Sequence, residues 1–103
     1  MREIALAHLD KVRPVLILTR DLARPAMRHV TVVPITSTVK GLSTEVSLGQ
    51  SNGLDHECVT AVDNTTTIPV AALGRVVGYL TADQERLLAG AIIRAFDLEA
   101  PLR

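Results

Sequence analysis

Short runs of branched apolar residues, each bounded by turn-forming or polar residues, most constrain the fold of this 103-residue chain. Runs of this length and composition predict strands. They recur along the chain at residues 3–9, 14–18, 29–35, 43–49, 58–62 and 74–80. Short strands at regular spacing with turns between them favour a small barrel over a parallel sheet.

A single amphipathic helix is predicted after the last strand. Thr81 is followed three residues later by Gln84, a capping box that marks a helix start. An apolar stripe then follows at helical spacing, made of Leu80, Leu87, Leu88, Ala91, Ile92, Ala95 and Phe96. Pro101 stops any continuation. We therefore expect one domain over residues 1–103, mainly β with a C-terminal helix.

Composition excludes several classes of site. Aromatic residues make up 2% of the chain, Tyr79 and Phe96, so a platform of aromatics for stacking bases is not available. Cys58 is the only cysteine, which fits a reducing cytosol and predicts a buried thiol. The three histidines are scattered, and no metal-ligand spacing or glycine-rich phosphate loop is present. No apolar run is long enough for a membrane span. We expect a cytoplasmic protein without metal or cofactor.

Charge is balanced overall but unevenly spread. Residues 1–40 carry seven cations and three anions, so a polyanion would meet this half first. The two halves can also interleave in space and cancel, which composition favours. Arg20, Arg24 and Arg28 have helical spacing, but Pro25 interrupts it and predicts a basic loop. Such arginines are either solvated or hold phosphates.

Two strand ends carry groups capable of chemistry. Pro14 cannot donate to a sheet ladder, so we place it at the first residue of its strand, with Arg13 held extended before it. A cation is thereby fixed on a rigid backbone, as a solvated charge at a sheet rim or as a catalytic or binding group. The hydroxyl-bearing residues Thr36, Ser37 and Thr38 follow the strand at 29–35. They form either an edge running into solvent or part of a site.

Several motifs in order resemble one family. "RPVLIL", then "VVPITST" about twenty residues on, "AVDNTTTIP", "LGRVVGYL" and the closing helix resemble the MazF/PemK toxins of bacterial toxin–antitoxin systems. The resemblance covers nearly the whole chain, and "DNTTTIP" is similar to a mycobacterial-type subgroup. It implies the small SH3-like barrel of the CcdB/MazF/PemK plasmid-maintenance toxins.

The resemblance also implies an activity and partners. Family members are sequence-specific, metal-independent endoribonucleases that cleave single-stranded RNA (messenger, ribosomal or transfer) and leave a 2′,3′-cyclic phosphate and a 5′-hydroxyl. They form homodimers, and a cognate MazE-like antitoxin blocks the RNA groove. By position, the catalytic arginine falls on Arg13 and the catalytic threonine on Thr36. RNA-binding residues are expected at Arg20, Ser37, Thr38, Lys40, Asp63 and Asn64.

These residue types suit the implied chemistry. Attack of a ribose 2′-oxygen on its own phosphate needs charge stabilisation on the phosphoryl oxygens, and the guanidinium of Arg13 offers a planar fork of donors. The hydroxyl of Thr36 adds a neutral donor. We assign Arg13 charge stabilisation, and leave open whether it also transfers a proton. His56, in the turn "GLDHE", is the alternative acid–base group or simply a turn histidine.

Two departures from the family and two other functions stay open. The stretch "MREIALAHLDKVRP" has a shortened loop between its strands, and Thr66 stands where a basic residue is common, so RNA specificity should differ. A CcdB-like gyrase-binding toxin would use a C-terminal Trp, whereas this chain has none and ends "FDLEAPLR". A non-catalytic dimeric binding module is the other alternative. Whether Arg13 and Thr36 converge on one groove distinguishes such a binding module from an endoribonuclease.

Overall fold

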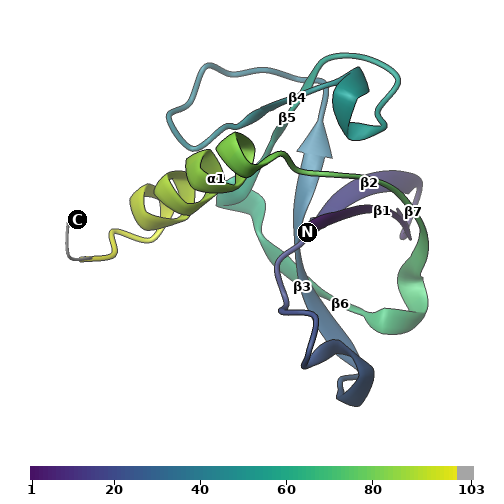
Figure 1. Cartoon of the computed structure of the whole chain (residues 1–103). Coiled ribbons are helices and arrows are strands. Elements are labelled where there is room, and N and C mark those ends of the chain that lie inside the picture. Colours follow the sequence, from purple (N-terminus) through teal and green to yellow (C-terminus); the bar gives the residue numbers. More distant parts are fainter. Residues whose placement is uncertain (100–103) are drawn as a thin grey trace.

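Antiparallel strands and one C-terminal helix form a half-barrel in the computed structural model, which describes residues 1–99 (Figure 1). The strands are β1 (Glu3–His8), β2 (Val12–Ile17), β3 (His29–Thr36), β4 (Ser47–Leu48), β5 (Cys58–Thr60), β6 (Thr66–Pro69) and β7 (Leu73–Tyr79). The helix is α1 (Ala82–Ala95). Short 3₁₀ turns are η1 (Arg24–Ala26), η2 (Gln50–Asn52), η3 (Val62–Asn64) and η4 (Val70–Ala72). The predicted class, mainly β with a closing helix, is confirmed.

The sheet runs in the order β4-β5-β3-β2-β1-β7, and β6 pairs separately with β3. Because β6 pairs with β3 while β7 pairs with β1, residues 66–79 arch from one side of β2 to the other (Figure 1). This arch curls the sheet and produces the half-barrel.

The central strands are buried on both faces, which explains their continuous apolar runs. Successive strand residues point to opposite faces. Ile4, Leu16 and Val33 accordingly pack in one cluster with Leu88 and Ala91 of α1. The other face packs a second cluster, made of Ala5, Ala7, Val15, Ile17, Val30, Val32 and Ile68. Both clusters are aliphatic, in keeping with the low aromatic content of the chain.

The capping box at the start of α1 is confirmed. The hydroxyl of Thr81 accepts the backbone N–H of Gln84 at 3.2 Å, and the Gln84 side chain accepts that of Thr81 at 3.0 Å. The predicted apolar stripe is only partly correct, because Leu87 and Phe96 are 58% and 55% exposed. One side of the helix packs on the sheet, and these two side chains lie outside that contact. Pro101, predicted to end the helix, lies outside the described residues.

Two predicted strands are shorter than expected, and one observed strand was not predicted. The strand expected at 43–49 shrinks to Ser47–Leu48, because the Glu45 carboxylate instead accepts the N–H groups of Lys40, Gly41 and Leu42 and folds this segment into a loop. The strand expected at 58–62 ends at Thr60 and passes into η3. β6 was not predicted, since only four residues pair and one is a proline. The basic loop at 20–28 is confirmed, with one short 3₁₀ turn.

Candidate functional site

A hollow of about 470 Å³ lies where β2 begins and β3 ends. Its walls come from β1, β2, β3, β7 and the segment between η2 and β5. The lining residues are Leu6, Val12, Arg13, Pro14, Ile35, Thr36, Ser37, Gly53, Leu54, Asp55, His56, Cys58, Arg75 and Val77. We call it the Arg13–Thr36 hollow, because both predicted catalytic residues line it.

The pairing of β2 with β3 brings these two residues together. Val15 pairs with Pro34, and Leu16 with Val33. Continued by two residues, the same register sets Arg13 opposite Thr36. Residues directly opposite in an antiparallel pair point to the same face and are near neighbours. The strand ends therefore present a guanidinium and a hydroxyl to one space.

The structure corrects the prediction about Pro14, which is the third residue of β2 and not the first. Leu18 donates its N–H to the Thr31 carbonyl of β3 at 2.9 Å, so every second residue of β2, Pro14 included, directs its nitrogen toward β3. Pairing with β3 begins only at Val15. The missing N–H of Pro14 therefore costs no ladder hydrogen bond.

Pro34 occupies an equivalent gap in β3. Its carbonyl accepts the N–H of Ala61 at 2.8 Å, on the side where β3 meets first β6 and then β5. Pairing with β6 ends at Val32, and pairing with β5 begins at Ile35. The proline falls between the two partners. The end of β3 can therefore leave β6 and carry Thr36 to the hollow.

The hydroxyl of Thr36 is fixed by its own chain. Its oxygen accepts the backbone N–H of Thr38 at 3.1 Å. A hydroxyl also has one hydrogen to donate, and this contact does not use it. Thr36 is thus held in place with a donor available to a ligand in the hollow.

The segment that forms the far wall is anchored by a buried amide. Asn52 is fully buried and donates to the Tyr79 carbonyl at 2.9 Å and to the Gln84 side chain at 2.6 Å. Its oxygen accepts the Gly49 N–H at 3.1 Å. Next to it, Gly53 has φ +82°, and a Cβ there would lie 1.9 Å from the Val77 carbonyl oxygen. This close approach of η2 to β7 needs glycine and fixes the start of residues 53–57.

Further side chains with chemical potential line the same hollow. His56 lies in the predicted turn, and the hollow brings it into one space with Arg13 and Thr36. Asp55 and Arg75 also line the hollow, and sequence reasoning assigned neither of them a role. Cys58 is buried, as predicted, and burial raises the pKa of its thiol. It therefore stays a neutral thiol near pH 7.

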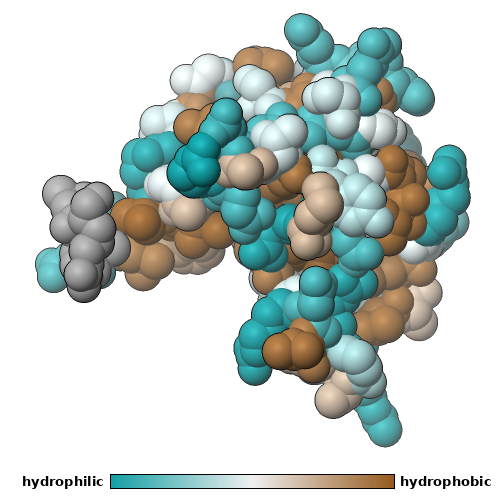
Figure 2. Space-filling model, in the orientation of Figure 1, coloured by the Kyte–Doolittle hydropathy of each residue, from teal (hydrophilic) through white to brown (hydrophobic). Residues whose placement is uncertain are grey.

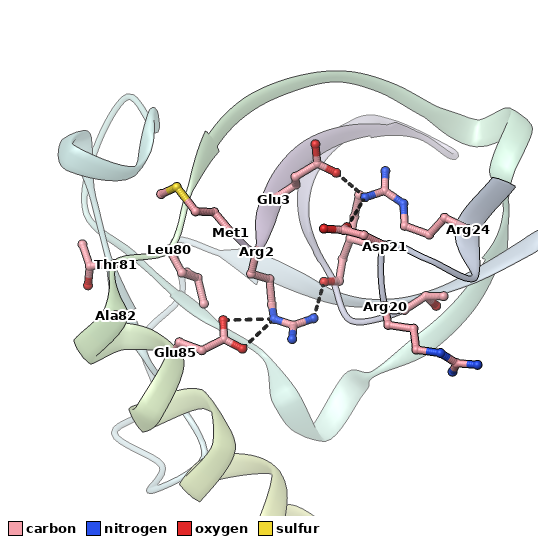
Figure 3. A pocket seen from close by; sticks show the side chains of 12 residues that line it. Met1, Arg2, Glu3, Arg20, Asp21, Arg24, Leu80, Thr81, Ala82 and Glu85 are labelled. Carbon is pink, nitrogen blue, oxygen red and sulfur yellow. Dashed lines mark hydrogen bonds and ion pairs between the residues drawn. The ribbon is translucent and has the colours of Figure 1, made fainter.

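Arg20 lies apart from this hollow. It lines a second one, of about 510 Å³, beyond the other end of β2 (Figure 3). There Arg2 donates to Glu85 at 2.9 Å, and Arg24 pairs with Glu3, whose hydrogen bond raises the pKa of that guanidinium. Figure 3 shows the Arg20 guanidinium pointing away from both ion pairs. The Arg2–Glu85 pair joins the basic first half of the chain to the acidic second half. This agrees with the alternative in which the two halves interleave in space and their charges cancel.

The other predicted RNA-binding residues divide into two groups. Ser37 lines the Arg13–Thr36 hollow, and the exposed residues Thr38 and Lys40 follow it in the loop after β3. Asp63 and Asn64 lie on η3 and do not line the hollow. Asp63 accepts the Thr44 hydroxyl at 2.7 Å, so its carboxylate ties η3 to the loop before β4.

Residues 1–99 contain neither a cluster of metal ligands nor a helix that could span a membrane. No group of three or more His, Cys, Asp or Glu side chains in this part of the chain could hold a metal ion. Among the described elements, α1 included, no helix has the length and apolar character needed to cross a membrane.

Comparison with known proteins shows the family. The model for the PemK-like, MazF-like toxin of type II toxin–antitoxin systems matches residues 3–96. This chain belongs to that family. The assignment agrees with the one suggested by the motifs, and it covers both Arg13 and Thr36.

Relatives within the PemK/MazF family are similar over nearly the full chain. Endoribonuclease MazF3 of Mycobacterium tuberculosis H37Rv is 59% identical over 96% of each chain. Probable endoribonuclease MazF5 of the same strain is 34% identical over 82% of this chain and 79% of its own. The structure of M. tuberculosis toxin MazF-mt6 has a TM-score of 0.93 and 57% identity, over 96% of this chain and 100% of that chain. The predicted mycobacterial-type likeness is confirmed, and these matches favour the PemK/MazF alternative over the CcdB-like one.

Proposed function

We propose that this PemK/MazF toxin is a metal-independent endoribonuclease that cleaves single-stranded RNA in the Arg13–Thr36 hollow. The observation that carries the proposal is that a guanidinium and a hydroxyl from neighbouring strands line one space. The names of the relatives support the activity, since MazF3 is an endoribonuclease. The same convergence counts against a non-catalytic binding module.

The reaction is an internal transfer. The ribose O2′ forms a bond to phosphorus while the bond from phosphorus to O5′ breaks. The 2′-hydroxyl loses a proton and the leaving 5′-oxygen gains one, which gives a 2′,3′-cyclic phosphate and a 5′-hydroxyl. Negative charge builds on the phosphoryl oxygens. Arg13 supplies a bidentate cation to these oxygens, and Thr36 supplies the hydroxyl hydrogen that Thr38 leaves free.

His56 is the second candidate for proton transfer, because it lines the same hollow. An imidazole is a common proton-transfer group, whereas a guanidinium mainly offers hydrogen-bond donors and positive charge. We expect the His56→Ala variant to keep most of its activity, since charge stabilisation by Arg13 is the main contribution. An inactive His56→Ala variant that thermal unfolding shows to be folded would instead make His56 the group that transfers the proton.

RNA beyond the cleaved nucleotide would lie along the strand ends. Ser37, Thr38 and Lys40 continue from Thr36 and suit phosphate and sugar contacts. Arg20, Asp63 and Asn64 line no part of the hollow, so contacts there need an RNA that extends past it. The turn between β1 and β2 has only residues 9–11, and none of these three residues lines the hollow. We propose that cut-site preference differs from that of longer-loop relatives for this reason.

Two partners follow from the family. A type II system pairs a toxin with a protein antitoxin, and a MazE-like antitoxin is proposed to cover the RNA site.

We also propose a homodimer, because Ile93, Phe96 and Leu98 are 36%, 55% and 52% exposed at the end of α1. Figure 2 shows apolar side chains gathered there. Light scattering at micromolar concentration tests this, and a monomer would rule the dimer out. We propose the cytoplasm as the site of action, because the proposed substrate is cellular RNA and a single cysteine suits a reducing compartment.

One experiment tests the proposed function as a whole. Purified protein is incubated with total RNA in EDTA, and new 5′-hydroxyl ends are mapped. We expect cuts at a recurrent short sequence. Intact RNA, or cutting that EDTA abolishes, would contradict the proposal. If the protein instead inhibited gyrase and left RNA uncut, the CcdB-like alternative would be supported.

A further inference from the structure

Arg75 is the second arginine of the Arg13–Thr36 hollow, and an irregularity in β7 accompanies it. Leu73 pairs with Ala7 of β1, and Val76 pairs with Ala5. Two residues of β7, Gly74 and Arg75, therefore stand against the single residue Leu6. This two-against-one arrangement is a β-bulge, a feature that redirects side chains and is common beside functional sites.

The bulge directs Arg75 to the hollow. A second irregularity follows, since Val76 pairs with Ala5 and Gly78 with Ile4, which leaves Val77 as an extra residue. Arg75 and Val77 both line the hollow, together with Leu6 across the bulge. At Gly74 a Cβ would lie 2.6 Å from Nε2 of His8, so this position of the bulge has little room for a side chain. Arg75 is the member of the pair that can reach a ligand.

The charge of Arg75 is not used within the described residues. Arg2, Arg24 and Arg86 form ion pairs with carboxylates, whereas within residues 1–99 the Arg75 side chain has no hydrogen bond or ion pair. Among residues 1–99, Asp55 is the one carboxylate that lines this hollow, whereas two arginines line it. The hollow therefore keeps a net positive charge. An anion that enters it meets two guanidinium groups, which bind phosphate through planar donors.

The spacing of strands separates the roles of the two arginines. Arg13 and Thr36 lie on adjacent strands, roughly 5 Å apart at the backbone, and can meet on one phosphate. Arg13 and Arg75 have β1 between their strands, roughly 10 Å at the backbone. We propose that Arg75 holds the phosphate next to the one that is cleaved, as a substrate-binding and positioning residue. This inference rests on the proposed ribonuclease function.

The test measures binding without cleavage. The probe is a short fluorescent RNA around the mapped cut site, with a 2′-O-methyl group on the nucleotide whose hydroxyl attacks. Arg75→Ala should weaken binding roughly tenfold, the effect of one lost charged hydrogen-bonding group. The slope of log affinity against log salt should fall by about 0.7, the value for one phosphate contact on a single strand. Arg75→Lys should keep the slope, because it keeps the charge.

Modified probes identify the phosphate. Two further RNAs carry a neutral methylphosphonate at the position immediately before or after the cleaved phosphate. One of them should bind wild type and Arg75→Ala equally. Arg86→Ala, which removes an exposed cation of α1 outside the hollow, is the matched control and should bind like wild type. Thermal unfolding of Arg75→Ala and Arg75→Gln checks that both variants are folded.

The outcomes separate this inference from the proposed function. If wild type cuts RNA but the folded variants Arg75→Ala and Arg75→Gln both keep the wild-type affinity and salt slope, Arg75 does not hold a phosphate. A loss that neither methylphosphonate cancels would also overturn the assignment, because Arg75 would then act elsewhere. If wild type cuts no RNA, the ribonuclease proposal itself fails.

Discussion

Arg13 and Thr36 lie opposite each other when the β2–β3 register is continued by two residues, and both line one hollow. The relationship depends on two prolines at places where no ladder hydrogen bond is lost, Pro14 before the β2–β3 pairing and Pro34 between two partners of β3. A cation and a hydroxyl are thereby held on rigid strand ends. Such preorganised groups stabilise developing charge without reorganising during the reaction.

Arg13→Ala should lower the RNA cleavage rate by on the order of 10²–10³, since it removes the main charge-stabilising group. Arg13→Lys should restore little, because an ammonium cannot reproduce the planar fork. Initial rates on a mapped substrate measure both. Arg13 is exposed, so the melting temperatures of the variants should match wild type. Near-wild-type cleavage by Arg13→Ala would remove Arg13 from the mechanism.

Thr36→Ala should cost less than Arg13→Ala, because a neutral donor contributes less than a charged one. Thr36→Ser keeps the hydroxyl and should retain most of the rate. The comparison uses the same substrate at saturating concentration, so that kcat is read separately from KM. A Thr36→Ala rate equal to wild type, or a Thr36→Ser variant as slow as Thr36→Ala, would show that the hydroxyl has no role.

Asn52→Ala should destabilise the protein by roughly 3 kcal/mol, since the Tyr79 carbonyl and the Gly49 N–H lose a buried partner. Urea unfolding gives the free energy. Asn64→Ala, at an exposed position, is the control and should stay within about 0.5 kcal/mol. If both variants unfold alike, the buried amide does not anchor η2.

Cys58 should make stability depend on alkaline pH. Burial raises the pKa of its thiol in the folded state, so the folded protein keeps a proton that the unfolded chain loses above about pH 8.5. Stability is full below that pH and declines as pH rises toward the folded pKa. Unfolding curves between pH 7 and 10 should show a steeper decline for wild type than for Cys58→Ala. Parallel declines would contradict the burial effect.

Local patterns predicted the parts of the molecule that local residues determine. Thr81 and Gln84 are three residues apart, and their capping box forms as expected. The apolar runs of β1, β2 and β3 are long enough to be read without knowing their partners. Arg13 and the hydroxyl-bearing run Thr36, Ser37 and Thr38 stand at the ends of such runs, and the resemblance to the MazF/PemK toxins singled out Arg13 and Thr36 as the catalytic pair.

Strand register and long-range contacts determined the features that local patterns did not predict. β6 is a strand only because Thr66–Pro69 pairs with β3. The role of Arg75 depends on a bulge against β1, which no pattern within β7 reveals. His56 reaches the hollow because Asn52 and Gly53 hold η2 against β7. None of these contacts is encoded by neighbouring residues.

The measurement that tests the central claim most directly is a double-mutant cycle on RNA cleavage in EDTA. Initial rates are compared for wild type, Arg13→Ala, Thr36→Ala and the double variant. If both groups act on one phosphate, the double variant should be little slower than Arg13→Ala alone, because groups that act as a unit are not additive. Losses that multiply fully would mean that Arg13 and Thr36 act independently, and would contradict a shared site.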